Sequence, residues 1–213
     1  ELKNSRLYIF RIYAIFIIHS LQFGRKTMNI TSILDHQWDD VRSIYLEAFP
    51  KAERKPFFTV RRSVKKGKAK IYTASENNTL LGFVMVIPYK NLVMVDYLAV
   101  SGKVRSKGTG SLLIQEMCRR FKDRKIILLI EQLDETAANS AQRIARKNFY
   151  LKNGFSSSDI FIKGTSGKME IMNRGKQITP QEYLELQKYA LGKLFFRLSK
   201  IKGKSANADF YQF

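Results

Sequence analysis

The pattern of apolar and polar positions predicts helices first and strands afterwards. Apolar residues recur at three- and four-residue steps through Asp35–Phe49, with Trp38, Val41 and Tyr45 on one face, which predicts an amphipathic helix. A second short helix with a basic C-terminal run is expected over Phe57–Lys70. The pattern then changes to short apolar stretches bounded by turn residues, which is typical of strands.

Three consecutive strands are predicted in the middle of the chain. They cover Ile71–Ala74, Leu80–Ile87 and Leu92–Val100, with turns expected at Glu76–Thr79 and Pro88–Asn91. Strands joined by such short turns can only fold back on each other, so these neighbours should pair antiparallel.

The second half of the chain alternates between the two kinds of element. No internal repeat or low-complexity linker interrupts it, so one mixed α/β domain is the simplest interpretation. The expected elements are a loop over Ser101–Gly110, a helix with Leu112, Leu113, Met117 and Phe121 on one face, a strand over Ile126–Ile130, a helix over Thr136–Asn153, a hairpin of Phe155–Lys163 and Lys168–Asn173, and a helix over Pro180–Leu198.

The expected domain covers residues 28–176, followed by a C-terminal helix over 177–200 that packs on it and a solvated tail over 201–213. Residues 1–27 are an apolar extension. Leu7–Phe23 is interrupted by Arg11 and His19 and is shorter than the roughly 20 apolar residues of a membrane span. The extension is thus an upstream segment outside a product that starts at Met28, an extra helix or strand, or, least favoured, a membrane anchor.

Charge limits the choice of partners. The 213 residues include 38 Lys and Arg against 18 Asp and Glu, a net charge of +20, which attracts nucleic acid, anionic lipid or a phosphorylated ligand. Charge alone does not choose among them. The basic runs Arg61–Lys70 and Arg119–Lys125 are mostly without the interleaved aromatic residues that stack on bases, which favours solvated faces over a nucleic-acid site.

Cysteine and histidine are scarce. Cys118 is the only cysteine, so no internal disulfide can form, and a cytoplasmic location is expected. The sequence contains no Cys/His cluster, so no metal site is predicted. Cys118 lies within a predicted helix, where packing is favoured over a nucleophilic role.

The strongest local motif is R-x-x-G-x-G, between a predicted strand and a predicted helix. Its residues are Arg105, Ser106, Lys107, Gly108, Thr109 and Gly110. Small residues let the backbone approach a ligand, and the free N–H groups of a helix start attract phosphate. The alternative is that the glycines serve only the turn.

A second cluster, F-Y-x-x-N-G-F, ends the helix predicted over Thr136–Asn153. Tyr150 within it has a phenol that can supply a proton to a nearby thiolate, whereas Phe149 can only pack. A core tyrosine at a helix end is the equally weighted alternative.

In this order and at this separation, the two clusters resemble the GNAT superfamily of N-acetyltransferases. The strand Val95–Val100 followed by R-x-x-G-x-G and a helix is similar to that family's central acetyl-CoA motif, and F-Y-x-x-N-G-F to its next motif. The resemblance covers roughly residues 30–173. It implies a mixed α/β fold with a central, mostly antiparallel sheet flanked by helices, splayed between the strands ending at Val100 and Glu131.

The resemblance also implies roles for individual residues. The cofactor pyrophosphate would lie on Arg105 through Gly110, with Ser111 behind them, and the pantetheine arm would pair with Leu98, Ala99 and Val100. The backbone N–H of Val100 would polarise the thioester carbonyl. Further roles are cofactor contact for Asn139 and Asn148 and protonation of the CoA thiolate for Tyr150.

The acceptor amine must lose a proton, and two carboxylates could take it. Asp96 lies where several family members carry a glutamate base, and Glu131 ends the neighbouring strand. Because Asp is shorter than Glu, a water-mediated role for Asp96 is favoured. A structural role at the strand end is the nearly equal alternative.

The resemblance therefore implies an acyltransferase that moves an acetyl group from acetyl-CoA, its co-substrate, to a primary amine in a ternary complex, as a monomer or homodimer without a metal. Two alternatives stay open. One is a non-catalytic acyl-CoA-binding module on the same fold, and the other is a basic protein that binds nucleic acid or a membrane surface.

Overall fold

The structure, a computed structural model, describes residues 28–51, 53–104, 108–164, 167–192, 196–197 and 202–205. The expectations for residues 1–27, for Arg105, Ser106 and Lys107, and for the last residues of the chain lie outside these ranges. None of the helices in the described ranges combines the length and the apolar character that crossing a bilayer requires.

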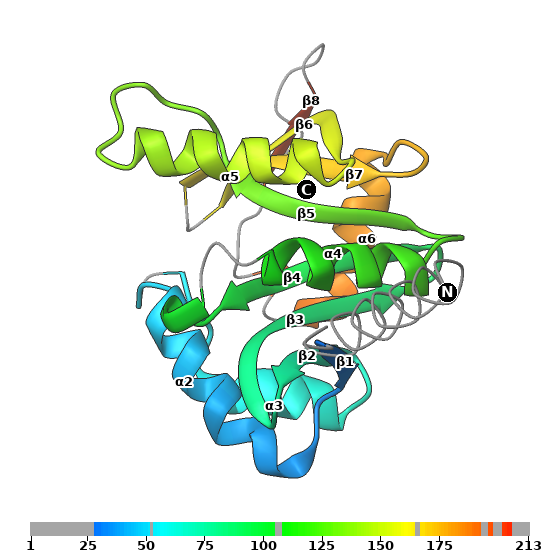
Figure 1. Ribbon diagram of the computed structural model, residues 1–213. Helices are drawn as coiled ribbons and strands as arrows, with labels where there is room; N and C mark the ends of the chain where they lie inside the picture. Colours follow the sequence, from blue (N-terminus) through cyan, green and yellow to red (C-terminus); the bar gives the residue numbers. More distant parts are fainter. Residues whose placement is uncertain are drawn as a thin grey trace, which may run out of the picture.

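One eight-stranded sheet forms the centre of the molecule (Figure 1). Its strand order is β1-β2-β3-β4-β5-β7-β6-β8, and every neighbouring pair is antiparallel except β4 and β5. The strands are β1 (Asn29–Ser32), β2 (Lys70–Glu76), β3 (Thr79–Tyr89), β4 (Leu92–Val100), β5 (Lys125–Glu131), β6 (Ser156–Gly164), β7 (Gly167–Arg174) and β8 (Lys202–Ser205). The mixed α/β fold class and the antiparallel pairing of the middle strands are confirmed.

Helices cover both faces of the sheet. The α-helices are α2 (Trp38–Ala48), α3 (Phe57–Lys65), α4 (Thr109–Arg120), α5 (Ser140–Lys152) and α6 (Pro180–Leu191), and short 3-10 turns cover Asp35–Gln37 and Gly102–Val104. Buried side chains of α2, α3 and α6 pack on one face. Those of α4, with the C-terminal end of α5, pack on the other, where Figure 1 shows both helices in front of the sheet.

A β-bulge in β4 opens the sheet. Tyr97 pairs with Met85 of β3 and Val95 pairs with Val86, so Asp96 is an extra residue on β4. The parallel pairing of β4 with β5 covers Leu92–Val95 and stops just before this residue. Because a bulge bends the strand that carries it, β4 turns away from β5 at Asp96. The predicted splay between the strands ending at Val100 and Glu131 is confirmed.

Turn residues account for two differences from the sequence pattern. The helix expected over Phe57–Lys70 ends at Lys65, because Gly67 takes a left-handed φ of +70° and Lys70 already begins β2. Pro88 was expected in a turn but lies in β3, paired with Val93, and the turn is confined to Lys90 and Asn91.

Three helix predictions were also wrong in detail. Leu112 of α4 is exposed, and Ile114 is buried in its place. The helix expected from Thr136 starts only at Ser140, because Asp134 accepts hydrogen bonds from the backbone and hydroxyl of Thr136 and forms a separate turn. The C-terminal α6 ends at Leu191, where the next residue is a glycine with positive φ, although Phe196 and Arg197 farther along the expected range are again helical.

Both edge strands are absent from the sequence-based prediction. β1 pairs with β2, although its sequence N-I-T-S has a single apolar residue. β8 pairs with Ile160–Lys163 of β6. Residues 202–205 are therefore part of the sheet, and the expectation of a solvated tail is wrong for them. These polar segments form strands because a neighbouring strand offers backbone hydrogen bonds, which an apolar pattern does not reveal.

Candidate functional site

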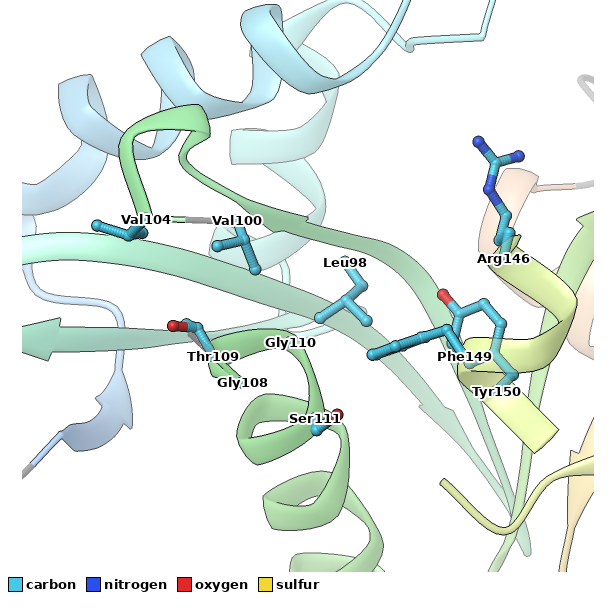
Figure 2. A pocket seen from close by; sticks show the side chains of 10 residues that line it. All are labelled: Leu98, Val100, Val104, Gly108, Thr109, Gly110, Ser111, Arg146, Phe149 and Tyr150. Carbon is cyan, nitrogen blue, oxygen red and sulfur yellow. The ribbon is translucent and has the colours of Figure 1, made fainter. Parts of the chain in front are cut away.

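A cavity of about 570 Å³ lies where β4 diverges from β5, on the face that α4 and α5 cover (Figure 2). It brings together the end of β4, the start of α4 and the C-terminal half of α5, which are far apart in the sequence. Its lining residues are Leu98, Val100, Val104, Gly108, Thr109, Gly110, Ser111, Arg146, Phe149 and Tyr150.

The start of α4 forms one wall. Gly108 is the N-cap, with a left-handed φ of +80°, and no side chain of the described residues caps the helix. The first intrahelical hydrogen bond in the following turn runs from Leu112 N–H to Gly108 O, at 3.0 Å. The N–H groups before it have no intrahelical acceptor, and the helix dipole adds partial positive charge, so this wall attracts an anion.

Thr109 adds a hydroxyl to the same wall. The residue is 1% exposed, and its Oγ1 is buried without a hydrogen-bond partner among the described residues. A buried unpaired hydroxyl costs free energy in the empty protein. It is the kind of group that an oxygen-rich ligand would satisfy.

The open edge of β4 forms the second wall. Ser101 N–H donates to Leu81 O at 2.8 Å, so Ser101 and Leu81 form a hydrogen-bonded pair at the end of the β3–β4 ladder. Hydrogen-bonded and non-hydrogen-bonded pairs alternate along an antiparallel ladder. Ala99 therefore bonds to β3, whereas the backbone groups of Val100 and Leu98 point to the open edge. Of the three residues expected to pair with a ligand, two offer backbone groups and Ala99 does not.

Gly82 of β3 allows β3 and β4 to approach closely next to this edge. A Cβ at Gly82 would lie 2.6 Å from Ala99 O and 3.1 Å from Val100 Cα. The sequence contained a signal for this contact, since a glycine inside a predicted strand marks a close backbone approach, but Gly82 was not singled out.

Tyr150 and Phe149 form the third wall, at the end of α5. Figure 2 shows the Tyr150 hydroxyl directed toward the space beside Leu98. Burial raises the pKa of the Tyr150 phenol to about 12, and the positive charge of Arg146 opposes this rise. Tyr150 is therefore protonated at neutral pH and can act as a donor.

Arg146 lies one helical turn before Tyr150 and lines the cavity, although the sequence analysis did not single it out. Its Nη1 donates to Glu131 Oε2 at 2.6 Å. The other oxygen of Glu131 accepts from Asn139 at 2.9 Å and lies 3.4 Å from the guanidinium of Arg143. Glu131 and Asn139, both expected at the site, thus lie behind its wall in one polar network.

Two further candidates also lie outside the cavity lining. Asn148 is exposed on α5. Asp96 forms an ion pair with Lys55, at 2.7 Å. Burial and, after it, the charge of Asp96 raise the pKa of Tyr183, which lies in α6 on the opposite face of the sheet from α4. Asp96 therefore approaches the splay from the side opposite the cavity.

The remaining chemistry of the described residues is sparse. Cys118 is buried in the core beneath α4, and burial raises the pKa of its thiol, as expected for a packed rather than nucleophilic cysteine. No group of three or more His, Cys, Asp or Glu in this part of the chain could hold a metal ion.

A family comparison identifies the segment that contains most of this site. Residues 67–157 match the family model described as an acetyltransferase (GNAT) domain. The matched range includes β4, the glycine loop, α4 and α5. No match to the sequence was found among curated proteins.

Solved structures share the fold at low sequence identity. A GNAT-family acetyltransferase of Bacteroides thetaiotaomicron has a TM-score of 0.62 at 17% identity, over 79% of this chain and 98% of that one. A Bacillus subtilis acetyltransferase in complex with CoA has a TM-score of 0.55 at 16% identity, over 70% and 99%. A GNAT acetyltransferase of Elizabethkingia anophelis with acetyl-CoA bound has a TM-score of 0.54 at 15% identity, over 72% and 100%.

The family match covers the residues that line the cavity, and the similar structures share the sheet and helices that shape it. Residues 67–157 of this chain therefore match an acetyltransferase (GNAT) domain, and the chain shares the fold of these solved acetyltransferases.

Proposed function

We propose that the protein transfers an acetyl group from acetyl-CoA to a primary amine while both substrates are bound. The observation that carries the proposal is the cavity, which joins an anion-attracting helix start, an open strand edge and a protonated phenol. Each has a counterpart in acetyl-CoA: the diphosphate, the amide-containing pantetheine arm and the thioester sulfur. The bound CoA and acetyl-CoA of two similar structures support the same choice.

The start of α4 would hold the diphosphate. Its free N–H groups supply donors, and the buried hydroxyl of Thr109 would add another if the start of the helix adjusts to the ligand. Arg105, Ser106 and Lys107 stay predicted members of this cradle, in which the two basic residues would add charge.

The open edge of β4 would orient the acyl end. Backbone groups of Leu98 and Val100 would pair with the pantetheine amides as a short extra strand does. The N–H of Val100 would then donate to the thioester carbonyl oxygen, where negative charge develops during attack. A single donor of this kind contributes about 10²–10³-fold in rate.

The transfer forms a C–N bond and breaks the C–S bond of the thioester. The lone pair of the neutral amine forms the C–N bond, the carbonyl oxygen takes the negative charge, and its return breaks the C–S bond and releases CoA thiolate. The amine nitrogen loses its proton to water or a carboxylate. Asp96 remains the first candidate base, acting through water, because it faces the splay from the acceptor side that we propose. Glu131 is the weaker candidate, because the two guanidinium groups of Arg143 and Arg146 contact its carboxylate, whereas Asp96 pairs with Lys55 alone among the described residues.

The net charge of +20 disfavours a polycationic acceptor by repulsion, so monoamines and peptide N-termini come first in a screen. A cytoplasmic location remains a prediction.

The test is calorimetric titration with acetyl-CoA at two salt concentrations, with desulfo-CoA in parallel, followed by an amine screen read by mass spectrometry. We expect one-to-one binding that Gly108→Val abolishes, and turnover that Tyr150→Phe lowers by about 10²-fold without loss of acetyl-CoA affinity. No binding at millimolar ligand would refute the proposal. Binding without turnover for any amine would indicate a non-catalytic binding module.

A further inference from the structure

Among the described residues that line the cavity, Arg146 has the one charged side chain, and the others are apolar, small or neutral. It lies on α5 one turn from Tyr150, and its charge partly opposes the rise that burial causes in the pKa of the Tyr150 phenol. A guanidinium in this position stabilises a negative charge that forms beside Tyr150.

Such a charge forms when the thioester breaks. The Tyr150 phenol has a pKa of about 12, whereas an alkyl thiol such as that of cysteine has a pKa of about 8.5. Full proton transfer from Tyr150 to the departing sulfur would therefore run uphill. Tyr150 can donate a hydrogen bond to the sulfur, but the negative charge stays on the sulfur and needs a cation nearby.

The ion pair with Glu131 does not neutralise the positive charge around Arg146. Glu131 lies between the guanidinium groups of Arg146 and Arg143, so one carboxylate faces two cations and the group keeps a net positive charge. Asn139 donates to the same carboxylate and fixes its orientation. Within the described residues, the hydrogen bond from Arg146 to Glu131 uses only Nη1, and the side chain is 41% exposed, so its other N–H groups are open to solvent or a ligand.

We infer that Arg146 stabilises the thiolate of CoA at this site, and that Glu131 is a positioning residue that holds the guanidinium at the cavity wall. The inference rests on the proposed function, because it requires CoA in the cavity. Tyr150 then acts as a hydrogen-bond donor to the same sulfur rather than as its proton source.

Few other groups among the described residues around the cavity could lower the pKa of the CoA thiol. The described cavity residues on β4 and α4 carry no titratable side chain. On α5, Tyr150 and Arg146 face the cavity, and Glu131 of β5 and Arg143 lie behind Arg146. A lowered thiol pKa would therefore be assigned to Arg146, with a smaller contribution from Tyr150.

The test measures the affinities of CoA and desulfo-CoA as a function of pH, from about pH 6 to 10, by calorimetry. Desulfo-CoA lacks the thiol, so the ratio of the two affinities isolates the sulfur and cancels every other titration. A thiol whose pKa falls by one unit on binding gives a tenfold rise of this ratio with pH. We expect a rise of at least threefold in the wild type, together with the ultraviolet absorbance of a thiolate in the complex.

Variants show which residue causes the rise of the affinity ratio with pH. Arg146→Met should abolish the rise, and Arg146→Lys should restore part of it. Arg143→Met is the matched control, because it removes the same charge from the same carboxylate one turn farther from Tyr150, and it should retain most of the rise. Glu131→Gln should reduce the rise without abolishing it, because Arg146 would be less well held.

The outcomes separate the two proposals. If neither CoA nor desulfo-CoA binds, the proposed function fails. If both bind but their ratio does not change with pH, or Arg146→Met leaves the rise intact, the role of Arg146 is refuted. If Arg146→Met weakens both ligands equally at every pH, Arg146 contacts another part of CoA, and the thiolate role is likewise refuted.

Discussion

The ammonium group of Lys55 donates hydrogen bonds to both carboxylate oxygens of Asp96, at 3.0 and 2.7 Å. The backbone of Lys55 is held as well. Its N–H donates to the Tyr97 hydroxyl at 3.2 Å, and its carbonyl accepts from the Tyr45 hydroxyl at 2.9 Å. The segment between α2 and α3 is therefore fixed to the bulge that opens the sheet.

The first prediction concerns this ion pair. Asp96→Asn and Lys55→Met should each lower the free energy of unfolding by on the order of 1 kcal/mol, because each leaves a partly buried group without its partner. The double variant should lose less than the sum of the two, as measured by urea denaturation. Strictly additive losses would show that the two side chains are not coupled.

The second prediction follows from the raised pKa of Tyr150. Because the folded-state pKa of about 12 lies above the unfolded value near 10, burial favours the neutral phenol, and its contribution to stability is complete below pH 10. That contribution, on the order of 2 kcal/mol, is lost as the pH rises toward 12. The stability difference between wild type and Tyr150→Phe should shrink over this range in chemical denaturation. A difference independent of pH would mean that the phenol titrates normally.

The third prediction tests whether the Thr109 hydroxyl is kept for a ligand. Thr109→Val preserves shape and removes the buried unpaired oxygen, so the ligand-free protein should gain up to about 1 kcal/mol in stability. Affinity for CoA should fall about tenfold, since the hydroxyl would otherwise bond to the ligand. Equal CoA affinity in wild type and Thr109→Val would refute this role.

The fourth prediction compares two glycines. Gly82→Ala places a Cβ 2.6 Å from the Ala99 carbonyl, so the strands must separate, and we expect a loss of about 1–3 kcal/mol together with weaker acetyl-CoA binding. At Gly110 the nearest atom to an added Cβ is a Phe149 ring carbon at 3.4 Å, which is close to ordinary contact. Gly110→Ala should therefore change the thermal midpoint far less. Similar midpoints would contradict the close approach at Gly82.

The fifth prediction concerns the last strand. Truncation after residue 201 removes β8 and exposes the β6 edge at Ile160–Lys163. We expect a lower thermal midpoint by several degrees and a greater tendency to self-associate, because an unpaired edge offers free backbone groups to another chain. Scanning fluorimetry and light scattering measure both. A truncated protein that is equally stable and monodisperse would show that β8 contributes little.

Local patterns predicted the elements that carry the site, because strand, glycine turn and helix are each encoded in contiguous residues. The same is true of Tyr150, which stands in a recognisable helix end. The exposed position of Leu112 could not be read from spacing, because Ile114 competes for the same core. Arg146 was missed for another reason: its importance comes from Glu131, fifteen residues away and on another element, and such a pairing exists only after folding.

For Asp96, the sequence predicted a candidate role but not the local structure. The resemblance to the GNAT superfamily marked it as a candidate base, yet neither the bulge nor the partner Lys55, 41 residues earlier, was predictable. Bulges arise from the register between strands, which depends on both partners at once.

The strand order has a consequence for how the chain could be divided. β1 to β4 form one contiguous half of the sheet and β5 to β8 the other, and the halves pair only along Leu92–Val95 and Lys125–Leu128. A break in the backbone between α4 and β5 would leave each fragment with all of its own strand partners. Reassembly would then depend on four parallel pairs, on the core that α4 shares with β5 and α5, and on α6, whose Glu185 and Gln187 reach back to Lys90 and Met94 in the first fragment.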